Sequence, residues 1–329
     1  MRLRRRANQS TGGETTLYFA TDLHGSEVCF RKFVAAAAFY HADLLVLGGD
    51  LTGKLVTPIV DRGDGTWSVE LHGEPRVYRT RDLDDLEAQL ANEGNYSRRM
   101  SRDEHADLER SPDAVEALFR ELMIERVAHW VDLARDRLEN TDVRVITAPG
   151  NDDPYEVDDV IRERGGDRVI LMEGEVTEVA PGHEMLNTGW SNHTPWKTHR
   201  EFDEPRIREH IDSMASRIAH PEAAIFNIHV PPHDTTLDTA PVLDEDLTVQ
   251  TSMGNPVTAP VGSTAVREAI EAHQPLASLH GHIHESGGSV RIGRTVAINA
   301  GSAYGEGILH GVLLTVGGGK LVRFQATTG

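Results

Sequence analysis

Five short apolar runs in this chain are each followed, within a few residues, by Asp, Asn or His. Such runs predict buried strands, and residues 17–21 and 44–47 flank a helical pattern over residues 26–41, which is the strand-helix-strand order of an α/β protein. Ligands bind at the carboxyl edge of α/β sheets, so the polar residues are expected to gather at one such edge. They occur in Thr21–Gly25, Gly48–Gly53, Pro149–Asp153, His229–His233 and His280–His284.

The remaining elements follow the same alternation, with one long interruption between the second and third core strands. Strands are predicted at residues 143–147, 169–171, 184–187, 224–228, 276–279, 295–298 and 311–316, and helices at 205–218 and 263–273. Residues 1–13 are expected to form a flexible tail. Residues 14–329 are expected to form a single α/β domain that carries an insertion.

The insertion is placed at about residues 54–110 and is followed by a long helix at about 112–139. Residues 58–61 and 66–71 are β-prone, and the Asp64-Gly65 pair between them predicts a hairpin. A short helix is expected over residues 82–90. By position the insertion is expected to cap the active-site mouth or to make a homodimer contact, with Trp67 and Tyr78 as its exposed aromatic residues.

Charge and cysteine content exclude several classes of protein. The 52 acidic and 33 basic side chains give a net charge of −19, which disfavours binding of a nucleic-acid polymer through a broad basic face. The single cysteine, Cys29, excludes an intrachain disulfide and a cysteine-based metal site. The longest apolar run, residues 33–40, is too short to span a membrane. We therefore expect a soluble, cytoplasmic protein with no membrane partner.

The polar residues at the strand ends have the chemistry of metal ligands. Asp22 and His24 are two residues apart, as are His282 and His284, so in extended chain each pair points the same way. Carboxylates, imidazoles and one amide without a thiolate suit Mn²⁺, Fe or Zn²⁺. Neighbouring glycines allow the backbone to turn sharply beside an ion.

The order Asp-x-His, Gly-Asp, Gly-Asn-Asp, His and Gly-His-x-His, spanning Asp22 to His284, resembles the calcineurin-like metallophosphoesterase superfamily. The resemblance is greatest to the prokaryotic branch related to cyclic-AMP phosphodiesterase, and Asn299–Ser302 is similar to the closing turn of that family. It implies a four-layer α/β/β/α sandwich with a binuclear metal centre. The insertion is longer than the connection usual in the family.

The resemblance also implies ligand roles. Asp22, His24 and His284 would bind one ion; Asn151, His229 and His282 would bind the other; and Asp50 would bridge them. Two divalent ions are implied, with manganese favoured and iron or zinc as alternatives. A hydroxide shared by the ions would attack phosphorus, so no nucleophilic side chain is needed.

Asp152 departs from the family pattern, because many members carry His at this position. Asn151 and Asp152 are the predicted catalytic pair. Beside two cations the pKa of Asp152 should be lowered, which makes it a poor general acid. Asp152 is instead expected to orient His24 by accepting a hydrogen bond from its ring.

The loop over residues 190–200 is the candidate substrate wall. His193, Trp196 and Arg200 are predicted to bind substrate by stacking and by gripping a phosphate. The alternative is an ordinary surface loop in which Arg200 pairs with Glu201 or Glu204, and the sequence leaves both open.

The function predicted from the sequence is metal-dependent hydrolysis of a small phosphoester, with a phosphodiester or nucleotide preferred. A phosphomonoesterase is the nearest alternative, because no motif separates the two reactions. A metal-loaded nucleotide-binding module with little turnover is a second alternative, motivated by Asp152. A DNA nuclease is disfavoured by the net charge.

Overall fold

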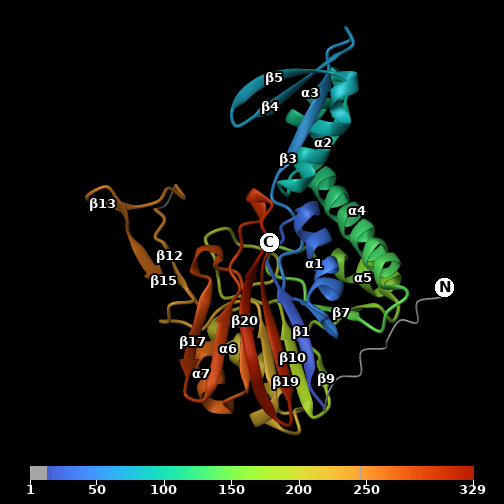
Figure 1. Cartoon of the computed structure of the whole chain (residues 1–329). Coiled ribbons are helices and arrows are strands. Elements are labelled where there is room, and N and C mark those ends of the chain that lie inside the picture. The colour runs from blue at the N-terminus through green and yellow to red at the C-terminus, as the bar shows by residue number, and fades with distance from the viewer. Residues whose placement is uncertain (1–12, 245) are drawn as a thin grey trace, which may run out of the picture.

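Two six-stranded sheets, packed face to face, form the centre of the protein (Figure 1). The computed structural model describes residues 13–244 and 246–329. The tail predicted over residues 1–13 therefore lies outside the described residues, apart from Gly13. Apolar side chains from both sheets meet in one buried cluster, among them Phe19, Val46, Ile225 and Leu279. The protein is a mixed α/β structure, as the sequence predicts.

The first sheet has the order β20-β19-β1-β2-β7-β8. The neighbouring strands β1, β2, β7 and β8 are parallel to one another. Beyond β1, strands β19 and β20 continue the sheet, each antiparallel to its neighbour. The strands are β1 (Thr15–Ala20), β2 (Leu44–Leu47), β7 (Arg144–Thr147), β8 (Val169–Leu171), β19 (His310–Gly317) and β20 (Lys320–Thr328).

The second sheet has the order β17-β18-β16-β11-β10-β9. Strands β18, β16, β11 and β10 are parallel, with an antiparallel strand at each edge. The strands are β9 (Val176–Ala180), β10 (His183–Thr188), β11 (Ile225–Ile228), β16 (Ala277–His280), β17 (Gly288–Ile292) and β18 (Thr295–Asn299).

Helices cover the face of each sheet that points away from the other sheet. Helices α1 (Glu27–Phe39), α4 (Pro112–Leu138) and α5 (Glu156–Gly165) share a buried cluster with the first sheet, and α6 (Glu204–Ala215) and α7 (Thr264–His273) share one with the second. The predicted start of α4 is confirmed, since the Ser111 hydroxyl accepts from Ala114 N and Pro112 opens the first turn. Within the described ranges, no helix carries an apolar stretch that could cross a bilayer.

The segment predicted as an insertion builds a separate four-stranded sheet of order β5-β4-β3-β6, which projects from the main body at the top of Figure 1. Its elements are β3 (Val56–Asp61), β4 (Thr66–Leu71), β5 (Glu74–Arg79), α2 (Leu83–Asn92), β6 (Tyr96–Met100) and α3 (Arg102–Glu109). The predicted hairpin is confirmed by the antiparallel pairing of β3 with β4. From this segment α4 runs back beside α1.

The prediction that Trp67 and Tyr78 are exposed is wrong. They face each other across β4 and β5 and are half-buried against the small core of the insertion, which contains Leu83 and Leu86. Trp67 Nε1 also donates to Thr80 Oγ1 at 3.1 Å. These aromatic side chains therefore stabilise the insertion itself.

A second projection, residues 239–244 and 246–261, lies between β11 and α7 and is called the arm below (Figure 1). Strands β12 (Thr239–Pro241) and β15 (Thr258–Pro260) pair antiparallel at its base, and β13 (Thr251–Ser252) and β14 (Asn255–Pro256) pair near its tip. In the described part of the chain, the remaining elements are four short 3₁₀ turns: Thr80–Asp82, Pro221–Ala223, His284–Ser286 and Tyr304–Glu306.

Candidate metal centre

The polar loops that follow β1, β2, β11 and β16 are joined by backbone hydrogen bonds. Asp22 N donates to Gly49 O at 2.9 Å and His24 N donates to Asp50 O at 3.0 Å, which ties the loops after β1 and β2 together. In the second sheet Gly281 N donates to His229 O at 2.9 Å. The His282 amide then donates to the Asp22 carboxylate at 3.0 Å, which links the two sheets. The parallel strands thus bring their carboxyl ends to one place.

One group of side chains consists of Asp22, His24 and His284, whose candidate ligand atoms all lie within 4.8 Å of one another. His284 Nε2 lies 3.2 Å from Asp22 Oδ1 and 3.0 Å from His24 Nε2. Two imidazole nitrogens that approach so closely, beside a carboxylate, form an arrangement that a shared cation would suit.

A second group consists of Asp50, His229 and His282, again within 4.8 Å. Asp50 Oδ2 lies 3.4 Å from His229 Nε2 and 3.6 Å from His24 Nε2, so Asp50 lies between the two groups. These side chains are six of the seven that the sequence predicts as ligands, and the seventh is Asn151. The first triad is the one that the resemblance implies, whereas the second contains Asp50 where the resemblance implies Asn151.

Four of these residues have backbone conformations that L-amino acids adopt rarely. The φ angles are 54° at Asp22, 41° at His24, 51° at Asp50 and 66° at His282. Non-glycine residues in this region carry a conformational cost that the surrounding structure must outweigh, and they concentrate at functional sites. All four of these strained residues contribute a carboxylate or an imidazole group to the two triads.

The tautomers and the unpartnered atoms fit a divalent cation. His24 Nδ1 donates to Thr52 O at 3.2 Å and His229 Nδ1 donates to Gly48 O at 3.0 Å, which leaves Nε2 of each ring as the nitrogen that can bind an ion when it carries no proton. His229 Nε2 and Asn151 Oδ1 are buried and have no hydrogen-bond partner among the described residues. Because orphaned buried polar atoms are costly, their presence here supports a ligand role.

The protonation states also suit a cation. Burial and the Lys54 ammonium lower the pKa of His24 to about 3, and burial together with His229 lowers the pKa of His282 to about 4, so both rings are neutral. Burial alone would raise the pKa of Asp22 and Asp50, but the charge of His229 holds both well below their usual range. Burial alone would lower the pKa of His229, but the carboxylates of Asp50 and Asp22 have the larger effect and raise this pKa to about 10. The carboxylates thus attract positive charge into the centre.

Asp152 does not orient His24 as predicted, because Thr52 O is the acceptor and Asp152 Oδ2 is 3.9 Å from His24 Nδ1. Asp152 instead pairs with Lys54 Nζ at 2.8 Å. Burial and the Asp50 carboxylate raise the pKa of Asp152 to about 6, because together they outweigh the Lys54 ammonium, which lowers it. Sequence reasoning missed Lys54, although it lies four residues after Asp50 in the same loop.

The candidate substrate residues separate into two sets. His193 and Trp196 line a cavity of about 430 Å³ that also contains Asp50, Asn151 and His284. Arg200 does not line this cavity, and the prediction that it grips a phosphate is wrong. Its guanidinium is only 1% exposed and is paired with Asp158 at 2.7 Å, so neither Glu201 nor Glu204 is its partner. Of the three predicted substrate residues, His193 and Trp196 thus line the cavity, whereas Arg200 lies in the protein interior.

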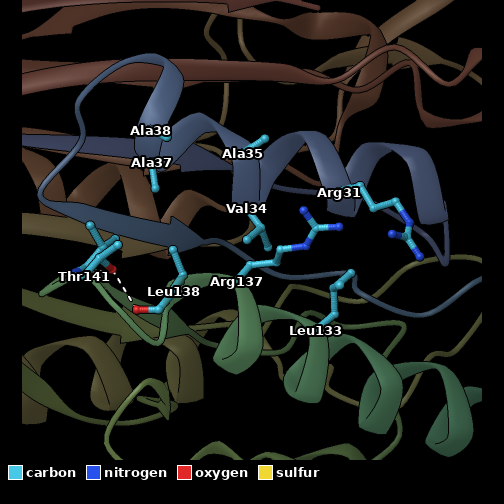
Figure 2. A pocket seen from close by; sticks show the side chains of 10 residues that line it. Arg31, Val34, Ala35, Ala37, Ala38, Leu133, Arg137, Leu138 and Thr141 are labelled. Carbon is cyan, nitrogen blue, oxygen red and sulfur yellow. Dashed lines mark hydrogen bonds between the residues drawn. The ribbon is translucent and has the colours of Figure 1, made fainter. Parts of the chain in front are cut away.

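A second large cavity, of about 390 Å³, lies between α1 and α4 (Figure 2). Its walls are apolar side chains such as Val34, Leu133 and Leu138, with Arg31 and Arg137 near them. None of the predicted ligands lines it. Size alone therefore does not locate the functional site, whereas the side-chain chemistry of the cavity beside Asp50 does.

Comparisons with known proteins show similarity of fold. No family model matches the chain. A 160-residue segment is 28% identical to the uncharacterized protein MJ1162 of Methanocaldococcus jannaschii; it covers 48% of this chain and 63% of that relative, so the match spans less than two thirds of its length.

Among solved structures, one aligns with 95% of this chain and 98% of its own at 13% identity and a TM-score of 0.56. The protein TT1561 of Thermus thermophilus aligns over 92% and 98% at 13% identity and a TM-score of 0.50. A dimetal phosphatase from Danio rerio aligns over 95% and 98% at 10% identity and a TM-score of 0.45. At these identities the first two similarities establish a shared fold.

The position of Asp22 depends on the absence of a side chain at Gly281. A Cβ at position 281 would lie 2.1 Å from Asp22 Oδ2 and 2.3 Å from Thr21 Oγ1. We expect Gly281→Ala to displace the Asp22 carboxylate and to weaken Mn²⁺ binding by about ten- to a hundredfold, as measured by calorimetry. Gly305→Ala is the matched control, because a Cβ there meets nothing within 4 Å. Equal affinities in the two variants would contradict this role.

Proposed function

We propose that this protein is a metal-dependent phosphoesterase of the calcineurin-like kind. The observation that carries the proposal is the pair of Asp/His triads, in which Asp50 of the second triad also lies close to His24 of the first. Asp50, His282 and His284 of these triads line the cavity of about 430 Å³. Asp22, His24 and His284 would hold one divalent ion; Asn151, His229 and His282 would hold the other; and Asp50 would contact both. The packing of helices, sheet, sheet and helices supports the four-layer sandwich that this class requires.

The donor set favours manganese, with iron or zinc as alternatives, because it combines carboxylate, amide and imidazole groups without thiolate. When bound, the two ions supply Lewis acidity and generate a nucleophile from water at neutral pH. The reaction joins the oxygen of water to phosphorus as the bond from phosphorus to the alcohol oxygen breaks, and the alcohol leaves with a proton.

The chain's own residues hold the substrate and the ligands in place. Lys54 Nζ lies at the cavity and is held by Asp152, so its ammonium can attract the anionic phosphoryl group. Asp152 positions Lys54, and its backbone amide donates to Asp50 Oδ1 at 3.0 Å, which fixes the central carboxylate. Asn151 Nδ2 donates to Thr198 Oγ1 at 2.9 Å. This bond fixes the orientation of the amide group, so its oxygen points away from Thr198.

A phosphodiester or a nucleotide remains the preferred substrate, and the nearest alternative is a phosphomonoester. The cavity of about 430 Å³ is large enough for an organic group beside the phosphoryl group. The insertion, which projects from the main body, is proposed as a cap or a homodimer contact.

Hydrolysis after metal removal and reloading tests the proposal. The chelated protein is expected to be inactive, and Mn²⁺ is expected to restore hydrolysis of bis(p-nitrophenyl) phosphate or p-nitrophenyl phosphate. Nucleotide binding without turnover would instead favour the binding-module alternative. Absence of both metal binding and turnover with Mn²⁺, Fe²⁺ and Zn²⁺ would contradict the function.

A further inference from the structure

The cavity at the metal centre continues outward between the arm and the loop that carries Trp196. It is lined by Asp50, Asn151 and His284 at the metal centre, and its apolar lining comes from Trp196 on the loop and from Val242 and Leu243 on the arm. Polar ligand groups at one end and apolar side chains at the other divide the cavity into two chemical zones. A phosphoester could thus place its phosphoryl group in the first zone and its organic group in the second.

The base of the arm is anchored to the metal centre. Ser286 Oγ, in the 3₁₀ turn that begins at His284, donates to Thr239 O at 2.6 Å. The buried Asp238 carboxylate accepts from Thr235 N at 2.9 Å and from Gly262 N at 3.0 Å, which closes the base of the arm from both ends. Val242 and Leu243 therefore lie at a fixed place relative to His284.

The opposite wall is held by Glu201. Its Oε1 accepts from Thr194 Oγ1 at 2.6 Å and from Thr198 N at 2.8 Å, which folds the loop around Trp196. Trp196 is 61% exposed, although the side chain is large and apolar. An exposed indole on a fixed loop at the edge of a cavity is suited to stacking against a flat ligand.

A polar atom lies between the two walls. Asn192 Nδ2 donates to Val261 O at 3.2 Å, which connects the loop to the arm. Asn192 Oδ1 is buried and has no hydrogen-bond partner among the described residues, and Asn192 lines the cavity. This oxygen can accept from an N–H group of a ligand.

The charge of the cavity limits the number of phosphoryl groups. Among the described residues that line it, Lys54 is the one Lys or Arg, and Asp152 already pairs with it. Glu285, which is exposed, also lines the cavity and adds a negative charge. A second phosphoryl group beyond the metal centre would thus meet no unpaired cationic side chain.

We propose that this site selects phosphoesters in which one phosphoryl group is joined to a flat, apolar group that lies between Trp196 and the arm. The inference rests on the proposed function and adds the substrate class to it. The flat group can be a nucleobase or another aromatic ring. A nucleobase would also donate to Asn192 Oδ1.

Three phosphomonoesters of primary alcohols test the selection, since their leaving groups are of similar basicity: 2-naphthylmethyl phosphate, thymidine 5′-phosphate and glycerol 1-phosphate. Their methyl diesters serve if the protein acts on diesters. Both aromatic esters are expected to exceed the glycerol ester in kcat/KM by about tenfold or more, mainly through KM, as expected for stacking on one aromatic side chain. A preference for thymidine over naphthylmethyl identifies a nucleobase site, and the reverse identifies a site for other aromatic groups.

Single substitutions test which residues cause the preference for aromatic esters. Trp196→Ala and Leu243→Ser are expected to reduce the aromatic-to-glycerol ratio about tenfold, whereas Met253→Ser, at a fully exposed position near the arm tip, should keep the wild-type ratio. Thymidine 5′-diphosphate is expected to bind more weakly than the monophosphate. Equal kcat/KM for all three esters, or a ratio that none of the variants changes, would overturn the inference and leave the proposed function intact. Absence of hydrolysis of every ester would count against the function itself.

Discussion

Asp50→Asn is expected to lower kcat/KM for phosphoester hydrolysis by at least about a hundredfold, since even residues that only support metal ligands contribute ten- to a hundredfold. Asp50 lies 3.6 Å from His24 Nε2 and 3.4 Å from His229 Nε2, so its charge serves both triads. Asparagine keeps the shape and the oxygen that accepts from Asp152 N. The loss should therefore come from metal binding and not from unfolding.

Asp43→Asn is the matched control for this substitution. Asp43 directly precedes β2, whereas Asp50 follows it, and the exposed Asp43 carboxylate accepts from Thr16 N at 2.8 Å. Metal content, thermal unfolding and kcat/KM are measured for both variants. An Asp50→Asn protein that retains its metal and its activity would refute the central position of Asp50.

Arg200→Met is expected to lower the free energy of unfolding by about 3–5 kcal/mol, because it leaves the carboxylate of Asp158 buried without its cation. The Arg200 guanidinium donates to both Asp158 oxygens, at 2.7 and 3.2 Å. It also donates to Asp153 O at 3.1 Å and Pro154 O at 3.2 Å, just after Asn151. The substitution should thus loosen the loop that carries Asn151 as well.

Arg162→Met is the control, because Arg162 contacts the same carboxylate from the surface. Its side chain is 58% exposed and lies 3.8 Å from Asp158, so its removal should change stability by at most about 1 kcal/mol. Urea unfolding measures both variants. Equal midpoints would show that the buried pair contributes no more than the exposed one, whereas recovery in Arg200→Met with Asp158→Leu would support the proposed cause.

The strand ends of the central sheets could be predicted because two local signals coincide there. Leu44–Leu47 is a fully apolar run, and Asp50 follows it after two glycines, so both the strand and its polar end are visible in the sequence. Ile225–Ile228 is apolar apart from Asn227, and His229 follows it directly. Parallel strands bring these ends together, which is why the residues of both triads could be named before their distances were known.

The elements that were missed lack such signals. β20 is an exposed edge strand of mixed polarity, and α5 buries little more than Val157 and Ile161. The arm contains proline at both paired strands, which argues against a strand in isolation. One signal was available there: Thr-Ala-Pro occurs at residues 239–241 and 258–260, and the two copies pair with each other.

Long-range pairing explains the errors at the candidate site. The sequence predicts that Arg200 either grips a phosphate or pairs with its neighbours Glu201 or Glu204, whereas its partner in the structure, Asp158, is 42 residues away. Lys54 was overlooked because its role depends on Asp152, which comes from another strand end. Burial and ion pairing between distant segments are not visible in local sequence.

Metal stoichiometry tests the central claim most directly. The purified protein is stripped with chelator, equilibrated with Mn²⁺, freed of unbound ion and analysed for metal by mass spectrometry. The two triads predict two ions per chain in the wild-type protein and a loss of bound metal in Asp50→Asn. A wild-type protein that binds no divalent ion under these conditions would contradict the account.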